Sequence, residues 1–176
     1  MPLQGENAQK MTKNDLRRTL RQDAMTHERP EFDAQVPDCQ TVMLFSALPD
    51  EVDMQAFADK CLNAGKTVLL PVVKGDDIEV RSYEGQQKMQ SGAFGILEPQ
   101  TAQFVDYQKI DVIYVPGMAF TEDGSRLGRG KGYYDRFLSL PALRNVRKIG
   151  VCASWRKVEN LPCEAHDVKM DEVIFV

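Results

Sequence analysis

The sequence predicts a single α/β domain in which a largely parallel sheet is flanked by helices, giving three layers. Three observations support this fold class. Apolar strand patterns alternate with helical patterns along the chain, an order typical of βαβ units with parallel strands. A glycine-rich loop joins a strand pattern at 112–115 to a helical pattern that begins near Tyr133, as at the ligand-binding edge of an open α/β sheet. The length of 176 residues suffices for one domain with a core and is too short for two ordinary domains.

The composition narrows the classes of function. A formal net charge of −4 provides no overall basic field, so we expect neither nucleic acid nor a membrane as a partner. The four cysteines form no C-x-x-C pair, which favours free thiols in a reducing cytosol. No apolar stretch approaches the length that crosses a bilayer, and we expect a cytoplasmic protein that is a monomer. Residues 1–11 are expected to form a flexible polar tail and residues 12–176 the domain.

The first expected element is an amphipathic helix. Thr12 and Asp15 resemble a capping box, and apolar residues follow at helical spacing, which predicts a helix over residues 12–27. Lys13 and Arg17 lie four residues apart and therefore share one face of this helix. On the residues alone, that face is a solvated basic surface.

A buried strand and a second helix come next. Residues 41–47 form a continuous apolar run typical of a central strand, and residues 48–64 are expected to form a helix that ends before a glycine. Asp50, Glu51 and Asp53 then fall in the first turn, where the helix dipole favours carboxylates. Their default role on this reasoning is structural.

Five further strands are expected to complete the sheet. A strand pattern at 66–73 follows the second helix, and a strand–helix–strand step is right-handed in nearly all cases, so the sheet is at least partly parallel. Residues 78–83 alternate between polar and apolar, which predicts a strand with one polar face near an edge. The remaining strands are expected at 111–116, 148–153 and 170–176. The predicted arrangement is Rossmann-like.

Three glycines of the central loop alternate with two cations. Gly128, Gly130 and Gly132 allow the backbone to approach a ligand closely, while Arg129 and Lys131 project from the same short segment. A guanidinium grips oxygens in bidentate fashion, an ammonium is a mobile point charge, and exposed N–H groups add further donors. The pattern predicts a binding site for phosphate oxygens.

The same loop leads to a candidate metal ligand and leaves one alternative open. Asp135 follows the cations, and a carboxylate beside a bound polyphosphate can hold Mg²⁺. The segment is not a P-loop, because Ser125 stands in place of the first glycine and Gly132 in place of the hydroxyl residue. A solvated surface loop of the same composition is the alternative.

Residues 126–136, Arg-Leu-Gly-Arg-Gly-Lys-Gly-Tyr-Tyr-Asp-Arg, resemble the signature of the methenyltetrahydrofolate synthetases, also called the 5-formyltetrahydrofolate cyclo-ligase family. Lys13-x-x-Leu16-Arg17 is similar to an element near the start of that family. Residues 91–99 are expected to form a loop, and within it residues 92–99 are similar to the family's G-x-x-G-I-x-E-P segment. The resemblance covers nearly the whole domain. It implies the same α/β fold.

The resemblance also implies roles for particular residues. Arg129 and Lys131 are the implied catalytic residues, and Asp135 with Asp171 is implied to hold Mg²⁺. In the implied folate site, the Glu51 carboxylate accepts N–H donors of the pterin. Phe94 has two interpretations: its ring stacks on a flat ring of the ligand, or it is a loop aromatic that covers the core. The implied ATP site comprises Lys13, Arg17, Gly128, Arg129, Gly130, Lys131, Gly132, Tyr133 and Tyr134. The implied folate site comprises Ser46, Glu51, Phe94, Lys131, Gly132 and Tyr133.

The implied activity is the ATP- and Mg²⁺-dependent conversion of 5-formyltetrahydrofolate to 5,10-methenyltetrahydrofolate, with release of ADP and phosphate. Transfer of the γ-phosphoryl group to the formyl oxygen gives an iminium phosphate, which N10 attacks before phosphate departs. The implied partner is this small-molecule folate, with or without a polyglutamate tail.

Other classes of function fit parts of the sequence. A sugar-phosphate isomerase or an acyl-transfer enzyme would recognise phosphate without ATP hydrolysis, but it needs a poised general base, and His166 has no visible partner. A non-catalytic folate or nucleotide binder would keep Glu51 and tolerate the loss of Asp135. A nucleic-acid module is disfavoured, because acidic residues are interspersed among the basic and aromatic residues of 126–136.

Overall fold

The computed structural model describes residues 11–176, so most of the tail expected at 1–11 lies outside the described residues. Within residues 11–176 the chain forms three α-helices and ten strands. The helices are α1 (Lys13–Ala24), α2 (Gln55–Asn63) and α3 (Tyr133–Leu138). The strands are β1 (Thr41–Met43), β2 (Thr67–Lys74), β3 (Asp77–Ser82), β4 (Met89–Ser91), β5 (Leu97–Pro99), β6 (Val112–Pro116), β7 (Ala119–Phe120), β8 (Arg126–Leu127), β9 (Arg147–Cys152) and β10 (Glu172–Phe175).

Six of the strands form one central sheet, in the order β10–β9–β6–β1–β2–β3. Numbered by their succession along the chain and followed from β3, these strands run 3-2-1-4-5-6, the order of doubly wound dinucleotide-binding folds. Every neighbouring pair is parallel except β2 with β3. The predicted fold class is therefore confirmed, and the strand expected near an edge is the antiparallel edge strand β3.

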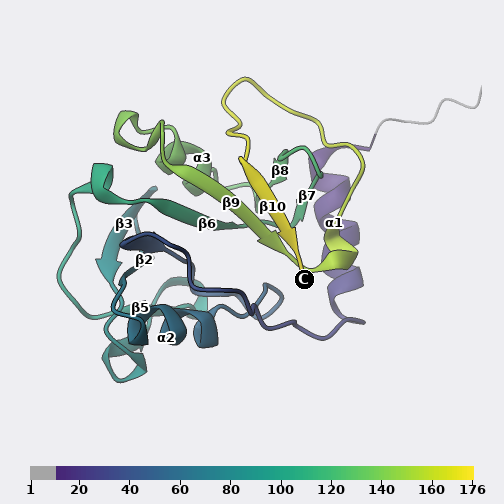
Figure 1. Cartoon of the computed structure of the whole chain (residues 1–176). Helices are drawn as coiled ribbons and strands as arrows, with labels where there is room; N and C mark the ends of the chain where they lie inside the picture. Colours follow the sequence, from purple (N-terminus) through teal and green to yellow (C-terminus); the bar gives the residue numbers. More distant parts are fainter. Residues whose placement is uncertain (1–10) are drawn as a thin grey trace, which may run out of the picture.

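Helices cover both faces of the sheet: α2 lies below it and α3 above it in the view of Figure 1. Val42 and Met43 are neighbours in β1, yet they belong to different cores, because successive strand side chains point to opposite faces. Val42 packs in the core that contains Phe57 of α2, and Met43 in the core that contains Phe137 of α3. Burial of both faces explains why the central strands are continuous apolar runs.

Helix α1 lies at the end of the sheet, beside the small β7–β8 hairpin (Figure 1). Thr12 caps it: the Thr12 hydroxyl accepts from the Asp15 amide at 3.1 Å, and the Asp15 carboxylate accepts from the Thr12 amide at 3.1 Å. The predicted capping box is thus confirmed. Leu20 buries itself against Met118 and Leu127. No helix within residues 11–176 is long and apolar enough to cross a membrane.

The second helix begins later than the sequence predicts. It starts at Gln55, and residues 48–54 form a loop instead of the first two turns. The loop is held by the Asp53 amide, which donates to the Pro30 carbonyl at 2.9 Å, and by the Asp53 carboxylate, which accepts from the Gln55 amide at 3.0 Å. Asp50 and Glu51 therefore do not act on the helix dipole, and the structural role assigned to them on that ground is wrong.

Two other predicted segments differ in the structure. The strand expected at 41–47 ends at Met43, after which the chain leaves the sheet toward the 48–54 loop. The segment 91–99, expected to be a loop, is mostly the antiparallel β4–β5 hairpin, in which Ser91 pairs with Leu97. At its tip Phe94 has a φ of +58°, a backbone conformation that is uncommon for any residue other than glycine.

Candidate active site

A cavity of about 1030 Å³ opens at the carboxyl ends of β1 and β6, where the strand order of the sheet reverses. Its walls come from α1, the loop after β1, the β4–β5 hairpin, the loop between β8 and α3, and the segment 162–167. With the exception of Asp171, all the predicted site residues line this cavity: Lys13, Arg17, Ser46, Glu51, Phe94, Gly128, Arg129, Gly130, Lys131, Gly132, Tyr133, Tyr134 and Asp135. Residues from distant parts of the chain thus meet in one place.

The glycine-rich loop passes along the cavity in a conformation that depends on two of its glycines. Gly130 has a φ of +102°, and Gly132, which precedes α3, has a φ of +73°. These values lie in the left-handed region that favours glycine. The Gly128 carbonyl accepts a hydrogen bond from Arg17 Nε at 2.8 Å, which ties α1 to the loop. Lys131 is exposed at the cavity, and within residues 11–176 its ammonium group has no ion-pair or hydrogen-bond partner, so it is available to a ligand.

Asp50 joins Arg129 to a buried arginine that the sequence analysis did not identify. One Asp50 oxygen accepts from Arg129 Nη2 at 2.7 Å, and the other accepts from Arg156 Nη2 at 2.9 Å. Arg156 is 2% exposed, and it also donates to the Met118 carbonyl at 3.1 Å. Burial raises the pKa of Asp50, but the two arginine charges outweigh this effect and hold the pKa below its ordinary value. Arg129 therefore has a fixed anchor on one side.

Glu51 lies beside this anchor and is almost fully buried. Its Oε1 accepts from the Leu48 amide at 2.8 Å, and its Oε2 lies 3.5 Å from Arg129 Nη2. Burial raises the pKa of Glu51, and the positive charge of Arg129 offsets this only in part. A carboxylate held in this way can exchange its weak contact with Arg129 for N–H donors of a ligand.

Arg126 forms the floor of the site between α3 and β6. Its Nε donates to the Pro116 carbonyl at 2.7 Å, and its guanidinium stacks over the ring of Tyr134 at 5.1 Å. Its Nη1 lies 4.0 Å from the Asp135 carboxylate. Burial lowers the pKa of Arg126, and Asp135 opposes this shift. Arg126 belongs to the signature, but its position in the sequence does not indicate that its guanidinium lies next to the Asp135 carboxylate.

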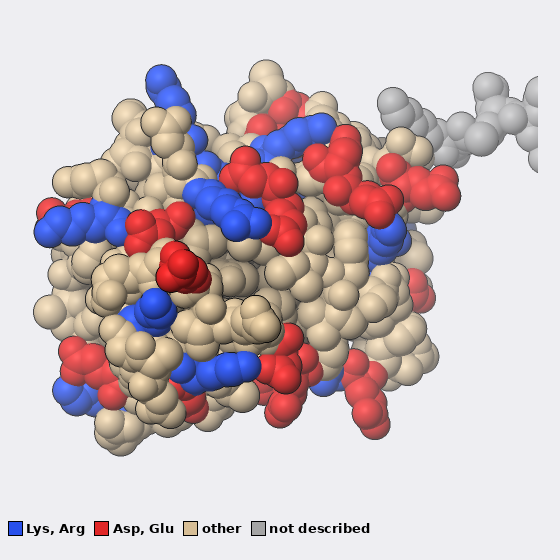
Figure 2. Space-filling view, viewed as in Figure 1, with Lys and Arg blue, Asp and Glu red and all other residues tan. Residues whose placement is uncertain are grey.

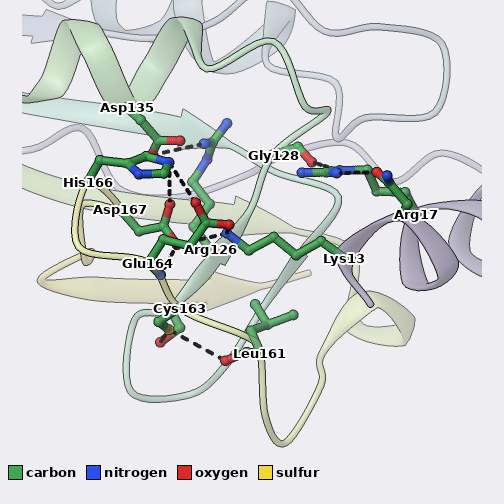
Figure 3. A network of polar contacts seen from close by, with 12 residues as sticks. Lys13, Arg17, Arg126, Gly128, Asp135, Leu161, Cys163, Glu164, His166 and Asp167 are labelled. Carbon is green, nitrogen blue, oxygen red and sulfur yellow. Dashed lines mark hydrogen bonds and ion pairs between the residues drawn. The ribbon is translucent and has the colours of Figure 1, made fainter. Parts of the chain in front are cut away.

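A second acidic group, Asp167, stands opposite Asp135 across this part of the cavity (Figure 3). The possible ligand atoms of Asp135, His166 and Asp167 all lie within 4.8 Å of one another. Asp167 Oδ2 accepts from Lys13 Nζ at 2.9 Å, and the Glu164 carboxylate lies 3.5 Å from the same ammonium group. Burial lowers the pKa of Lys13, but these two carboxylates outweigh it and raise the pKa overall.

The structure does not bring Asp171 to the cavity. Its carboxylate accepts from the Lys148 amide at 2.8 Å, and its amide donates to the Lys148 carbonyl at 2.8 Å. Lys148 is near the amino end of β9, and β9 is parallel to β6. Asp171 therefore lies at the amino ends of the parallel strands, whereas the cavity lies at their carboxyl ends. The prediction that Asp171 shares a metal with Asp135 is corrected accordingly, because Asp167, four residues earlier, is the acidic group that meets Asp135.

The β4–β5 hairpin covers the folate side of the predicted site with alternate residues. Phe94, Ile96 and Glu98 line the cavity. The Phe94 ring is 60% exposed, so it is available for stacking. Ser46, at the other wall, also lines the cavity and offers a hydroxyl group there. Both residues are placed where the sequence analysis expected a ligand.

The charged surface around the molecule is mixed. On the face shown in Figure 2, Lys and Arg side chains alternate with Asp and Glu side chains and form no continuous basic surface. This agrees with the net charge of −4. The positive charge of the site is therefore local, and it is concentrated where Arg129, Lys131 and Arg17 line the cavity.

Comparison with known proteins identifies relatives of the chain. The family model for the 5-formyltetrahydrofolate cyclo-ligase family matches residues 6–176. The 5-formyltetrahydrofolate cyclo-ligase of Escherichia coli is 30% identical over 139 residues, which cover 76% of this chain and 76% of the relative. A probable 5-formyltetrahydrofolate cyclo-ligase of Schizosaccharomyces pombe is 31% identical over 153 residues, covering 77% of this chain and 74% of the relative.

Solved structures show the same fold. The structure of 5,10-methenyltetrahydrofolate synthetase from Aquifex aeolicus superimposes with a TM-score of 0.73 at 29% identity, covering 93% of this chain and 89% of that one. A 5,10-methenyltetrahydrofolate synthetase from Mycoplasma pneumoniae gives a TM-score of 0.70 at 24% identity and supports the fold alone.

Proposed function

The chain belongs to the 5-formyltetrahydrofolate cyclo-ligase family, and from this premise we propose that it uses ATP and Mg²⁺ to convert 5-formyltetrahydrofolate to 5,10-methenyltetrahydrofolate, releasing ADP and phosphate. The observation that carries the proposal is the cavity at the reversal of strand order, where the predicted site residues meet. It collects the loop cations and the carboxylate of Glu51, and its volume of about 1030 Å³ is at the upper end of the range of ligand sites, which suits two substrates side by side.

The chemical difficulty of this reaction is the formyl oxygen. An amide-like oxygen is a poor leaving group, and phosphorylation turns it into a good one. The formyl oxygen attacks the γ-phosphorus and ADP leaves, giving an iminium phosphate. N10 then attacks the formyl carbon, the C–O bond breaks with departure of phosphate, and loss of the N10 proton leaves the conjugated methenyl cation. The protein has little covalent chemistry to perform, so it must align the reacting atoms and stabilise charge.

Lys131 and Arg129 are placed to stabilise the transferred phosphoryl group. The Lys131 ammonium is exposed at the cavity without a partner among residues 11–176, so a phosphate oxygen would be its first ion-pair partner. Arg129 keeps one contact with Asp50 while the rest of its guanidinium faces Glu51 and the cavity. In the proposed complex, Arg129 therefore contacts both the phosphate groups held by the loop and the pterin end of the folate. The formyl oxygen and the γ-phosphorus meet beside it.

The remaining ATP contacts are assigned to α1 and to the loop backbone. Lys13 and Arg17 lie on the face of α1 that borders the cavity, and Arg17 is already bonded to the loop through the Gly128 carbonyl. Tyr133 and Tyr134 open α3 directly after the glycines. In this arrangement the nucleotide binds between α1 and the loop.

The folate is assigned to the opposite wall. Glu51 binds N–H donors of the pterin, Phe94 stacks on a ring of the ligand, and Ser46 offers a hydroxyl group in the same cavity. Tyr133 also lines the cavity and completes the folate wall from the side of α3. This places the formyl group near Arg129 and Lys131.

The donor set at Asp135 fits Mg²⁺. Mg²⁺ prefers oxygen ligands and is commonly held by one or two carboxylates together with substrate phosphates, and Asp135 and Asp167 offer two carboxylates on the phosphate side of the cavity. These two residues would hold the ion, and its charge would neutralise the phosphate oxygens of ATP. Arg126 and Lys13 balance the same carboxylates in the absence of the ion.

The test of the proposal is a spectroscopic assay. Purified protein is mixed with 5-formyltetrahydrofolate, ATP and Mg²⁺, and the near-ultraviolet absorbance of the conjugated methenyl product is followed. A rise that requires both ATP and Mg²⁺ supports the proposal. A flat trace from protein that still binds ATP would overturn the cyclo-ligase reaction and leave a nucleotide-binding function.

Variants of the loop cations test the assignment of residues. Lys131→Ala and Arg129→Ala are each expected to lower kcat by about a hundredfold, because loss of one charge-assisted contact in a closed site costs about 3 kcal/mol of transition-state stabilisation. Arg18→Ala is the matched control, since Arg18 is an exposed cation of α1 that does not line the cavity. Turnover near the wild-type value in either loop variant would contradict the assignment.

A further inference from the structure

His166 has no role in the reaction as proposed, yet it lies directly at the carboxylate pair. Figure 3 shows its ring on the segment 161–167, facing Asp135 and Asp167. Its Nε2 is 3.3 Å from Glu164 Oε2 and 3.5 Å from Asp167 Oδ1. The side chain is 66% exposed, so a ligand can reach this nitrogen from the cavity. The imidazole is therefore neither buried nor committed to packing.

The spacing of the three side chains is slightly wider than the coordination sphere of a small divalent ion. With metal–ligand bonds of about 2.1 Å, neighbouring ligand atoms of an octahedron lie about 3.0 Å apart and opposite ones about 4.2 Å apart. The distance of 3.5 Å from His166 Nε2 to Asp167 Oδ1 is close to the first value. The three possible ligand atoms, one from each residue, lie within 4.8 Å of one another, a limit about 0.6 Å wider than the second value, so small side-chain movements would bring them onto one ion.

The two oxygens of Asp167 are divided between different neighbours. Oδ2 accepts from Lys13 at 2.9 Å, whereas Oδ1 is the oxygen that faces His166. A metal ion on the Oδ1 side can therefore bind without displacing the ammonium group of Lys13. The Asp135 carboxylate approaches from α3, with Arg126 4.0 Å behind it. The two carboxylates thus each have a cationic neighbour outside the coordination sphere, an arrangement typical of metal sites.

We propose that His166 supplies an imidazole nitrogen to the metal held by Asp135 and Asp167, and that the site consequently prefers Mn²⁺ and similar transition-metal ions to Mg²⁺. This inference rests on the metal site of the proposed function and adds a third protein ligand to it. Imidazole is a good ligand for transition-metal ions and a poor one for Mg²⁺, which favours carboxylate, phosphate and water oxygens. The alternative is that His166 only contacts Glu164 and Asp167 and does not bind the metal.

The experiment measures metal binding directly, with neither ATP nor folate present. Mn²⁺ alone is titrated into the full chain, and free Mn²⁺ is counted by electron paramagnetic resonance. Pulsed measurement of bound Mn²⁺ then detects magnetic coupling to a histidine ¹⁴N nucleus, which only a directly bound imidazole produces. Mg²⁺ affinity follows from competition with Mn²⁺. The variants are His166→Asn and Asp135→Asn, and the control is His27→Asn, because His27 is the other histidine and does not line the cavity.

The expected results separate a ligand from a neighbour. His166→Asn is expected to abolish the ¹⁴N coupling and to weaken Mn²⁺ binding by at least about tenfold, since loss of even an indirect partner of a metal ligand costs that much. It should weaken Mg²⁺ binding by less than about threefold, because oxygen ligands dominate for Mg²⁺. Asp135→Asn should weaken the binding of both ions, and His27→Asn should change neither.

Three results would overturn the inference: no saturable Mn²⁺ binding by the wild type, bound Mn²⁺ without ¹⁴N coupling, or equal loss of Mn²⁺ and Mg²⁺ affinity in His166→Asn. None of them bears on the absorbance assay of the proposed reaction, which uses Mg²⁺ and both substrates. Failure of the inference and failure of the proposed function are therefore distinguishable.

Discussion

Asp50 shows how one side chain in the loop after β1 fixes the position of another. Arg156 is buried and needs a carboxylate, and Asp50 meets that need with one oxygen while it holds Arg129 with the other. Removing one partner of a buried ion pair leaves an uncompensated charge, which costs about 3 kcal/mol or more. Asp50 thus stabilises the fold and orients a residue of the proposed site at the same time.

The proposal that Asp167, and not Asp171, is the second metal ligand can be tested with two variants. Asp167→Asn is expected to raise the Mg²⁺ concentration required for half-maximal activity by about tenfold or more, because it removes a charged ligand. Asp171→Ala should keep the wild-type Mg²⁺ requirement. It should lower the free energy of unfolding by about 1 kcal/mol, because the Lys148 amide loses its acceptor. The reverse pattern in Mg²⁺-dependent assays would restore Asp171 to the site.

Glu51 gives a prediction that links stability to pH. Burial raises its pKa in the folded protein above the ordinary value of 4.5, so the folded state binds this proton more tightly than the unfolded state does. Wild-type stability therefore falls, relative to Glu51→Gln, as the pH rises from 4.5 through the folded pKa. The variant should be the more stable protein at neutral pH, and the difference should shrink as the pH falls toward 4.5.

Denaturant unfolding over a pH series measures this effect. The same variant should bind 5-formyltetrahydrofolate about tenfold more weakly, because a charge-assisted hydrogen bond to the pterin is lost. Glu159→Gln, at an exposed position, is the control. A Glu51→Gln protein that is less stable than the wild type at neutral pH would show that its contacts with Leu48 and Arg129 outweigh the cost of burial.

Among the elements, α1 is attached to the fold with little fully buried apolar surface. Its one buried residue is Leu20, which packs against Met118 and Leu127, and the helix carries Lys13 and Arg17 to the cavity. Most helical stability in proteins comes from such packing rather than from intrinsic propensity. The wall of the cavity that α1 forms therefore depends on this apolar packing together with the polar contacts of Lys13 and Arg17.

Leu20→Ala is expected to remove about 3 kcal/mol of packing free energy and to loosen α1 specifically. Hydrogen exchange should accelerate at the amides of α1 and remain slow at those of β6, and KM for ATP should rise. Gln22→Ala, on the exposed side of α1, is the matched control. Equal acceleration of exchange in α1 and β6 would mean that the helix is part of the global folding unit.

At the scale of the whole molecule, the cavity is enclosed by segments that are far apart in the sequence. A ligand that contacts α1, the loop after β1, the glycine-rich loop and residues 162–167 holds these segments together. Any ligand that binds only the folded state raises its stability by mass action. The effect of ATP on unfolding therefore reports on the assembled site.

ATP with Mg²⁺ at a hundred times its dissociation constant is expected to raise the free energy of unfolding by about 2.7 kcal/mol. At the same ATP concentration, Lys131→Ala should lose most of this gain. Without ATP it should unfold like the wild type, because Lys131 is exposed and its ammonium group makes no ion pair within residues 11–176. Thermal unfolding with and without ATP checks both statements, and an unchanged wild-type midpoint would contradict nucleotide binding in the cavity.

Local patterns in the sequence were sufficient to predict the class of the fold and most of its elements. A helix and a strand that bury one face show different periods of apolar residues. The elements α1, β2, β3, β6 and β9 could therefore be predicted to within a few residues. The signature at 126–136 predicted the loop that borders the cavity, because its glycines and cations serve one chemical purpose in one short segment. The second helix was predicted to start too early, because the Asp53 amide bonds to the distant Pro30 carbonyl, a contact that the local sequence pattern does not reveal.

The sequence by itself determined the order of the elements, the family and the identity of the loop, because each of these is encoded in neighbouring residues. Only the tertiary structure decided which charges meet. Arg156 reaches Asp50 across 106 residues of sequence. Asp167 rather than Asp171 meets Asp135, because residues 167–171 run from the carboxyl ends of the parallel strands to their amino ends. Such pairs depend on strand order and on the direction of each strand, and neither leaves a periodic trace in the sequence.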